Sequence, residues 1–197
     1  MQGIASDWGP RTGVVKAPGI PRQGVQGLHH VLWGSGLADE MAHENDPNDR
    51  VGNMIIYSAS YPLTCEPDDV LACQAYNRRY NYYCTDVQAR GAYPSFAKRM
   101  LEELGVTLEA QPEDAEILKN GTVDFITFSY YMSSCQTAKD MKGGECNILG
   151  GVPNPNLSAS DWGWQIDPKG LRYALNDLYD RHGQTPMVGE QRLGPQD

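Results

Sequence analysis

The sequence predicts an α/β fold in which parallel strands alternate with helices. Three observations support this: short apolar runs rich in β-branched residues, amphipathic stretches with helical spacing between them, and turn residues that separate the two. Along the chain they give the order helix, strand, helix, strand, helix, strand, which is typical of parallel pairing. Periodicity leaves open whether the sheet is flat or closes into a barrel.

The first quarter of the chain is predicted to be a loop followed by a helix and a strand. Residues 1–24 are rich in glycine, proline and arginine and are expected to form a loop. Residues 26–44 carry leucine, valine and methionine at helical spacing, and turn residues follow. Residues 51–57 form a short apolar run that suits a strand buried on both faces.

The middle of the chain is predicted to form several helices followed by a second strand. Pro67 and the two acids after it are expected to open a helix that runs to about Asn81 or beyond. The further expected elements are a loop at 61–64, helices at 93–104 and 113–118, and a strand at 123–128.

The last third is predicted to hold a long loop, a helix and a weaker strand. Residues 134–160 are rich in glycine, proline, asparagine and serine, and loops of that length are usually functional or mobile. A helix is expected over 168–182, and 186–190 is the third strand candidate.

Composition excludes several classes of function. The formal net charge is −9 and no basic stripe is present, so no nucleic-acid partner is expected. No apolar run is long enough for a bilayer, and the start lacks the features of a signal peptide, so a cytoplasmic protein without a membrane partner is expected. The five cysteines include no C-x-x-C pair, and no nucleotide-binding or serine-hydrolase motif occurs. No metal site and no cofactor are predicted.

A carboxylate and a pair of tyrosines stand where strands are expected to end. Glu190 follows a short apolar stretch, where a β/α barrel projects its catalytic groups, although an ordinary solvated glutamate fits the pattern too. Tyr130 and Tyr131 close the second strand, and side-chain alternation should point one towards the barrel mouth and the other away. A core tyrosine is the alternative for either of them.

Histidines and tryptophans give further candidates. His29 and His30 are neighbours on the first helix, so their side chains diverge by roughly 100° and do not readily share a metal ion. Trp162 and Trp164 flank Gly163 in a loop ahead of a helix. Such rings either stack on the apolar face of a sugar or pack back onto the fold.

Several segments together resemble glycoside hydrolase family 1, and in particular its phospho-glucosidase branch. The most specific match is Ser-Asp-Trp-Gly-Trp-Gln-Ile-Asp-Pro-Lys-Gly-Leu-Arg at 160–172. Ser-Tyr-Tyr-Met-Ser at 129–133 is the form typical of that branch. Gln-Gly-Leu-His-His at 26–30 and Tyr-Pro-Leu-Thr-Cys at 61–65 fit as well. The resemblance covers about residues 25–194 in the family's order and spacing.

The resemblance implies a (β/α)₈ TIM barrel, of which this chain covers about strands 5 to 7 and their helices. Residues 1–24 are then a poorly matched segment and residues 25–197 a partial barrel. It implies retaining hydrolysis of 6-phospho-β-D-glucosides to glucose 6-phosphate, with a phosphorylated β-glucoside as the partner. Glu190 falls at the nucleophile position, Tyr131 where a tyrosine contacts the nucleophile, and Ser129 where the sugar subsite is lined.

The sequence also departs from the family pattern. Gln191 and Arg192 follow Glu190 where the family has Asn-Gly, and the resemblance begins after the acid/base motif and ends before the phosphate-binding residues. The isolated chain is therefore expected to lack activity. A catalytically incompetent fragment, a sugar-binding remnant and a plain β-glucosidase stay open as alternatives, and so does a homo-oligomer.

Overall fold

The computed structural model describes residues 21–139 and 150–191. These residues divide into two compact units. Unit 1 holds the described residues up to Val51 together with Tyr83–Asp124, and unit 2 holds Gly52–Tyr82 and the described residues from Phe125 onwards. Each unit is described by itself.

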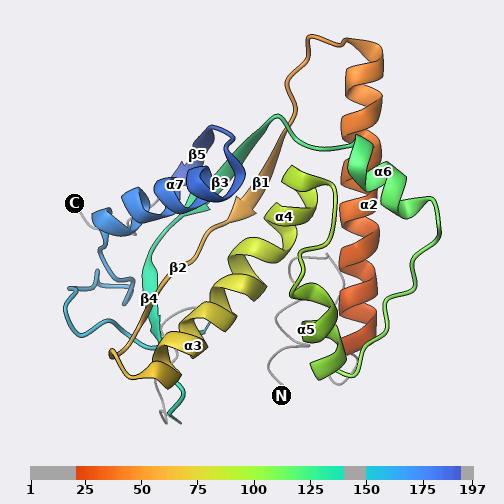
Figure 1. Ribbon diagram of the computed structural model, residues 1–197. Helices are drawn as coiled ribbons and strands as arrows, with labels where there is room; N and C mark the ends of the chain where they lie inside the picture. Colours follow the sequence, from red (N-terminus) through yellow and green to blue (C-terminus); the bar gives the residue numbers. More distant parts are fainter. Residues whose placement is uncertain (1–20, 140–149, 192–197) are drawn as a thin grey trace. The chain divides into compact units, whose positions relative to one another are not determined.

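Unit 1 is helical. It contains α2 (Pro21–Asn45), α4 (Tyr83–Arg90), α5 (Ala97–Glu103) and α6 (Asp114–Asn120). The short helix α6 lies against the long helix α2 (Figure 1). The core of unit 1 is formed by buried residues from all four helices and the segment after α5: Val25, Leu28, Leu32, Tyr83, Val87, Ala97, Leu101, Val106 and Leu118.

The helices of unit 1 follow the predictions with shifted ends. The predicted helix over 26–44 is confirmed, but α2 begins at Pro21, so the loop prediction is wrong for residues 21–24, while residues 1–20 lie outside the described part. Proline suits a first helical turn because its missing N–H has no partner there. The helix predicted over 93–104 is shorter, from Ala97 to Glu103, and Pro94 disfavours helical geometry at Tyr93.

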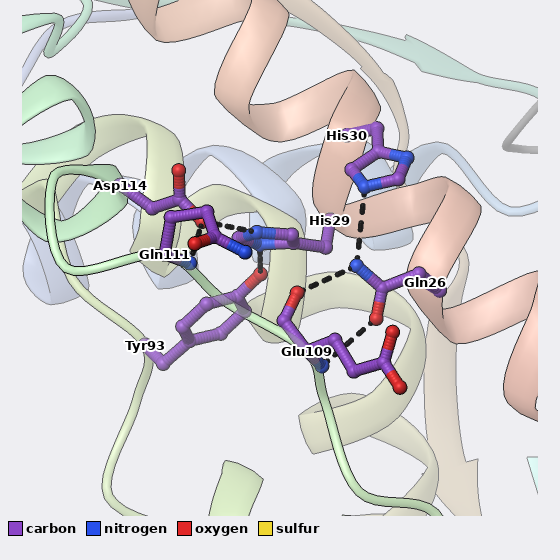
Figure 2. A network of polar contacts seen from close by, with 7 residues as sticks. All are labelled: Gln26, His29, His30, Tyr93, Glu109, Gln111 and Asp114. Carbon is purple, nitrogen blue, oxygen red and sulfur yellow. Dashed lines mark hydrogen bonds and ion pairs between the residues drawn. The ribbon is translucent and has the colours of Figure 1, made fainter.

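A polar network ties the 109–114 segment to α2 (Figure 2). The ring of His29 is buried between the Tyr93 hydroxyl and the Asp114 carboxylate, each 2.9 Å from a ring nitrogen. Burial raises the pKa of Asp114, but the Gln111 backbone N–H and His29 lower it by more, so the net shift is downward. His30 points elsewhere and contacts Gln26, as the divergence of neighbouring helical side chains predicts.

Unit 2 is built on parallel strands. Its main sheet has the order β1 (Gly52–Ile56), β3 (Phe125–Tyr130), β5 (Pro186–Gln191), and both pairs are parallel. All three predicted strands are therefore confirmed, and they lie side by side in the order in which they occur along the chain. A second parallel pair joins β2 (Ala59–Pro62) to β4 (Ser133–Gln136).

The second strand pair corrects two loop predictions. β2 includes the first two residues of the loop predicted over 61–64. The last three residues of β4 lie in the loop predicted over 134–160, of which residues 140–149 are outside the described part. Both strands are only four residues long, Ala-Ser-Tyr-Pro and Ser-Ser-Cys-Gln, and neither carries a clear apolar alternation. Backbone pairing between them, not a side-chain pattern, makes them strands.

The helices of unit 2 flank its strands. α3 (Pro67–Asn77) packs on β2 and β4, and a π-helical turn, η1 (Arg78–Tyr82), continues it, which confirms the helix predicted to Asn81 or beyond. α7 (Pro168–His182) has the predicted bounds. Asp167 caps its N-terminus by accepting a hydrogen bond from the Gly170 N–H, and Gly183 ends it in the left-handed region at φ 69°.

The first strand differs from the prediction in its burial. β1 was expected to be buried on both faces, yet Met54 is 55% exposed and Ile56 37% exposed. Both side chains project from the same face of the sheet, because side chains alternate along a strand. The prediction of a strand buried on both faces is therefore wrong for this face of β1.

Candidate active site

The register of the main sheet places the predicted site residues on one face. Ile56, Ser129 and Glu190 are paired across β1, β3 and β5. Residues paired across parallel strands project from the same face, and Tyr131 follows Ser129 by two positions. The three predicted site residues therefore lie on one face, at the carboxyl ends of two neighbouring strands. They are Ser129, Tyr131 and Glu190.

A β-bulge in β5 decides the face on which Glu190 lies. Val188 pairs with Phe128, yet Glu190 pairs with Ser129, so Gly189 is the extra residue. Without the bulge, Glu190 would pair with Tyr130 and project from the opposite face. A Cβ on Gly189 would lie 2.9 Å from the sulfur of Met54, which shows how closely the bulge approaches β1.

The tyrosine pair diverges as predicted. The Tyr131 hydroxyl donates a 2.8 Å hydrogen bond to Oε2 of Glu190. The Tyr130 hydroxyl instead donates a 2.7 Å bond to the backbone carbonyl of Asp167, and burial raises its pKa. Tyr131 thus faces the carboxylate, and Tyr130 joins the strand end to the segment before α7.

Ser129 is buried between the two outer strands. Its backbone carbonyl accepts a 3.0 Å hydrogen bond from the Tyr57 N–H, and its side chain lies in the same row as Glu190. The position agrees with a residue that lines a site around the Glu190 carboxylate.

A row of aromatic rings extends from the carboxylate. The Tyr131 ring lies 5.8 Å from the Trp164 ring, and Trp164 lies 5.8 Å from Trp162 in an edge-on arrangement. Trp164 is half-buried, whereas Trp162 is 59% exposed and so does not pack back onto the fold. An exposed indole beside a carboxylate offers a flat apolar surface of the kind on which a sugar ring stacks.

A tight hairpin presents the two tryptophans. Its two arms are joined by backbone bonds from Ser160 to Trp164 and from Ile166 to Ser158, at 2.8 and 2.9 Å. The buried side chain of Gln165 exchanges two hydrogen bonds with the backbone of Asn154, at 2.6 and 2.8 Å. These contacts fix the base of the hairpin.

Sequence reasoning missed Asp167. This buried residue accepts hydrogen bonds from the hydroxyls of Tyr61 and Ser133, which come from β2 and β4. The signal was present, since an aspartate directly before Pro168 is typical of a helix N-cap. Its hydroxyl partners could not be found from the sequence, because both come from the strands that were predicted as loops.

The described residues hold neither a cluster of metal ligands nor a membrane-spanning helix. No group of three or more histidine, cysteine, aspartate or glutamate side chains within 21–139 and 150–191 is arranged to hold a metal ion. No helix in these ranges is long and apolar enough to cross a membrane.

Sequence comparison identifies relatives. The sequence profile of glycosyl hydrolase family 1 matches residues 5–195. The chain is 48% identical over 174 residues to a 6-phospho-beta-glucosidase of Clostridium longisporum, covering 87% of this chain and 36% of that protein. It is 44% identical over 191 residues to a 6-phospho-beta-glucosidase of Dickeya chrysanthemi and 43% identical to a phospho-cellobiase of Klebsiella oxytoca, covering 95% of this chain and 41% of each.

Structural comparison agrees on the fold. The chain superimposes on the AHE enzyme of Alicyclobacillus herbarius with a TM-score of 0.73, at 20% identity and over 89% of this chain and 39% of that one. A psychrophilic beta-glucosidase from Micrococcus antarcticus gives a TM-score of 0.71 at 22% identity, over 85% and 39% of the two chains. The chain spans about two fifths of the length of these proteins.

These matches confirm the predicted fold class, an α/β chain that forms part of a (β/α)₈ barrel. Parallel strands in chain order are what successive strands of such a barrel show. Because the profile match extends over nearly the whole chain, the chain belongs to glycosyl hydrolase family 1.

Proposed function

We propose that the protein is a retaining glycoside hydrolase that cleaves 6-phospho-β-D-glucosides, with Glu190 as its nucleophile. The observation that carries this proposal is the hydrogen bond from Tyr131 to Glu190 at adjoining strand ends, in a chain of family 1. Catalytic groups of β/α barrels come from the carboxyl ends of the strands. The Tyr131 hydroxyl, which donates to Oε2, orients the Glu190 carboxylate at the strand end.

The reaction takes two steps in this proposal. The Glu190 carboxylate attacks the anomeric carbon, the bond to the leaving oxygen breaks, and a second carboxylic acid gives its proton to that oxygen. Water then attacks the glycosyl ester, the second carboxylate takes a proton from the water, and Glu190 is released. The two carboxyl groups of retaining enzymes lie about 5–5.5 Å apart.

The substrate class is inferred from the relatives and from Ser129. Curated relatives at 43–48% identity are named 6-phospho-beta-glucosidase and phospho-cellobiase. Ser129 lies beside Glu190 in the register, where it would contact the sugar. The products would be glucose 6-phosphate and an alcohol, formed in the cytoplasm, and no metal or cofactor takes part.

A substitution at Glu190 tests the chemistry. In the protein as its gene encodes it, we expect release of aryl alcohol from an aryl 6-phospho-β-glucoside, with the β-anomer of glucose 6-phosphate formed first. Glu190→Gln removes the nucleophile and should reduce the rate to background, while Glu102→Gln, at an exposed position of α5, should leave it unchanged. Full activity in Glu190→Gln, or α-anomer as the first product, would refute the proposal.

The phosphate assignment has its own test. Hydrolysis of the phosphorylated aryl glucoside should exceed that of the plain aryl glucoside under the same conditions. If only the plain sugar reacts, the protein is a plain β-glucosidase and the assignment of the substrate is wrong.

A second candidate is sugar binding without catalysis. Gln191 favours it, because it stands directly after Glu190 where the family pattern has asparagine. The aromatic row would then hold a glucoside beside an inactive carboxylate. Binding of the phosphorylated glucoside without turnover, equal in wild type and Glu190→Gln, would support this candidate over the first.

A further inference from the structure

Asp167 makes more contacts than a helix cap requires. Its Oδ1 accepts the cap bond from the Gly170 N–H at 2.9 Å. Its Oδ2 accepts from the hydroxyls of Tyr61, at 2.8 Å, and Ser133, at 2.7 Å, and its backbone carbonyl accepts from Tyr130. Serine, threonine or asparagine would cap the helix equally well. The second carboxylate oxygen therefore serves the two hydroxyls rather than the helix.

These contacts connect four elements at one point. Tyr61 belongs to β2, Tyr130 to β3 and Ser133 to β4, and Gly170 lies in the first turn of α7. Burial and the bond to Asp167 raise the pKa of Tyr61, so its hydroxyl stays a donor. Asp167 itself is only 6% exposed, so water competes little for these bonds.

Gly170 packs closely against Asp167 and Tyr130. A Cβ on Gly170 would lie 2.1 Å from the Tyr130 hydroxyl oxygen and 2.6 Å from Oδ2 of Asp167. Only a glycine fits there, so the carboxylate, the Tyr130 hydroxyl and the first turn of α7 are held in direct contact.

The contacts of Asp167 act on both sides of the candidate site. Trp164 lies three residues before Asp167, at the end of the tryptophan hairpin, and contacts Tyr131. Tyr130, which Asp167 holds through its carbonyl, is the neighbour of Tyr131. Fixing Asp167 therefore fixes the hairpin on one side and the tyrosine that contacts Glu190 on the other.

We propose that Asp167 is a positioning residue, which sets the distance between the Trp162–Trp164 hairpin and the Tyr131–Glu190 pair. The inference rests on the proposed function, because the distance matters only if a sugar stacks on the hairpin while Glu190 reacts with it. A misplacement of about 1 Å can cost on the order of 100-fold in rate, so rigid placement has a large effect.

Fluorine NMR on protein labelled with 5-fluorotryptophan tests this without any need for activity. Resonances are assigned by replacing each tryptophan with phenylalanine in turn. Asp167→Ser keeps a capping oxygen but is too short to reach Tyr61 and Ser133. We expect it to shift or broaden the resonances of Trp162 and Trp164, whereas the resonance of Trp33, which lies in unit 1, should stay in place.

Two further variants make the outcome decisive. Tyr61→Phe deletes a single donor to Asp167 and should give a smaller change of the same kind, which keeps the test available if Asp167→Ser does not fold. Asp177→Asn is the matched control. Asp177 is a carboxylate of α7, and it accepts hydrogen bonds from the hydroxyls of Tyr57 and Tyr82. Its replacement by asparagine weakens these two bonds and should leave the resonances of Trp162 and Trp164 unchanged.

The result shows whether Asp167 positions the hairpin or only stabilises the fold. If Asp167→Ser folds and the resonances of Trp162 and Trp164 match the wild type, or if Asp177→Asn moves them equally, the inference is wrong. In the full protein, Asp167→Ser should also lower kcat/KM on the order of 100-fold. If an aryl 6-phospho-β-glucoside leaves the Trp162 resonance of the wild type unchanged, the result counts against the proposed function. The effect of Asp167→Ser in the ligand-free protein still tests the positioning role by itself.

Discussion

At the scale of single residues, the Asp69 carboxylate accepts four hydrogen bonds outside the candidate site. One oxygen accepts from the backbone and hydroxyl of Thr64, and the other from the Thr137 hydroxyl and the Ala138 N–H. These hydrogen bonds, chiefly those from the two hydroxyls, lower the pKa of Asp69 to about 2. The carboxylate thus joins the segments that follow β2 and β4.

The lowered pKa of Asp69 predicts an acid-sensitive contribution to stability. The unfolded aspartate has a pKa of about 3.9, so the contribution is complete above that pH and is lost as the pH falls towards 2. The urea midpoint of the wild type should therefore exceed that of Asp69→Asn at pH 5, and the gap should narrow at pH 2.5. Asp68→Asn, at an exposed position, should show no such gap. A gap that is independent of pH would contradict the assignment.

The Tyr131 hydroxyl gives a second prediction for a single residue. Tyr131→Phe keeps the ring beside Trp164 but removes the bond to Glu190, and should lower the free energy of unfolding by about 1 kcal/mol. Urea denaturation measures the change. Tyr179→Phe is the control, since Tyr179 is 55% exposed and should tolerate the loss of its hydroxyl. Equal stability of Tyr131→Phe and wild type would show that the bond adds nothing.

At the scale of elements, two of the four glycines of α2 lie in different surroundings. A Cβ on Gly34 would meet nothing within 4 Å, whereas a Cβ on Gly36 would lie 3.2 Å from the Ile117 carbonyl oxygen of α6. Gly34→Ala should raise the stability of unit 1 by about 0.5–1 kcal/mol, because alanine loses less conformational freedom in a helix. Gly36→Ala should gain less or be destabilising. Thermal unfolding followed at 222 nm measures both, and an equal gain from both would contradict the packing of α2 on α6.

The elements also show what the sequence could predict. The helices over 26–44 and 168–182 and the three strands carry apolar periodicity or cap signals, and each exists. β2 and β4 were missed because their four-residue sequences lack an apolar alternation, and each gains its structure from a partner 74 residues away in the chain, as in the pair Ala59 and Ser133. The sequence pattern also could not predict from which face of the sheet Glu190 projects. Simple alternation along β5 would place Glu190 on the opposite face, because it does not include the bulge at Gly189. The isolated glycine in a strand was the available hint.

At the scale of the whole molecule, the main sheet presents an uncovered apolar row. Met54 and Met187 are 55% and 51% exposed, and they share the face of Glu190. Exposed apolar patches of this kind bind hydrophobic dyes or partners. The chain of 197 residues by itself should therefore enhance the fluorescence of the dye ANS.

A charge on that row should abolish most of the dye response. Met54→Lys combined with Met187→Lys places two charges on the face of Glu190, whereas Met41→Lys changes a methionine of α2 that is 59% exposed and lies in unit 1. We expect the double variant to lose the enhancement and Met41→Lys to keep it. The opposite pattern would place the dye-binding surface in unit 1.

The central claim is that Glu190 is the nucleophile of a phospho-β-glucosidase. It is tested most directly by trapping the covalent intermediate with an activated 2-deoxy-2-fluoro-6-phospho-β-glucoside and identifying the labelled peptide by mass spectrometry. The protein as its gene encodes it should carry one 2-deoxy-2-fluoro-6-phosphoglucosyl group, bound as an ester to Glu190, and Glu190→Gln should carry none. An adduct on any other carboxylate, or turnover of the phosphorylated glucoside with no adduct at all, would contradict the claim.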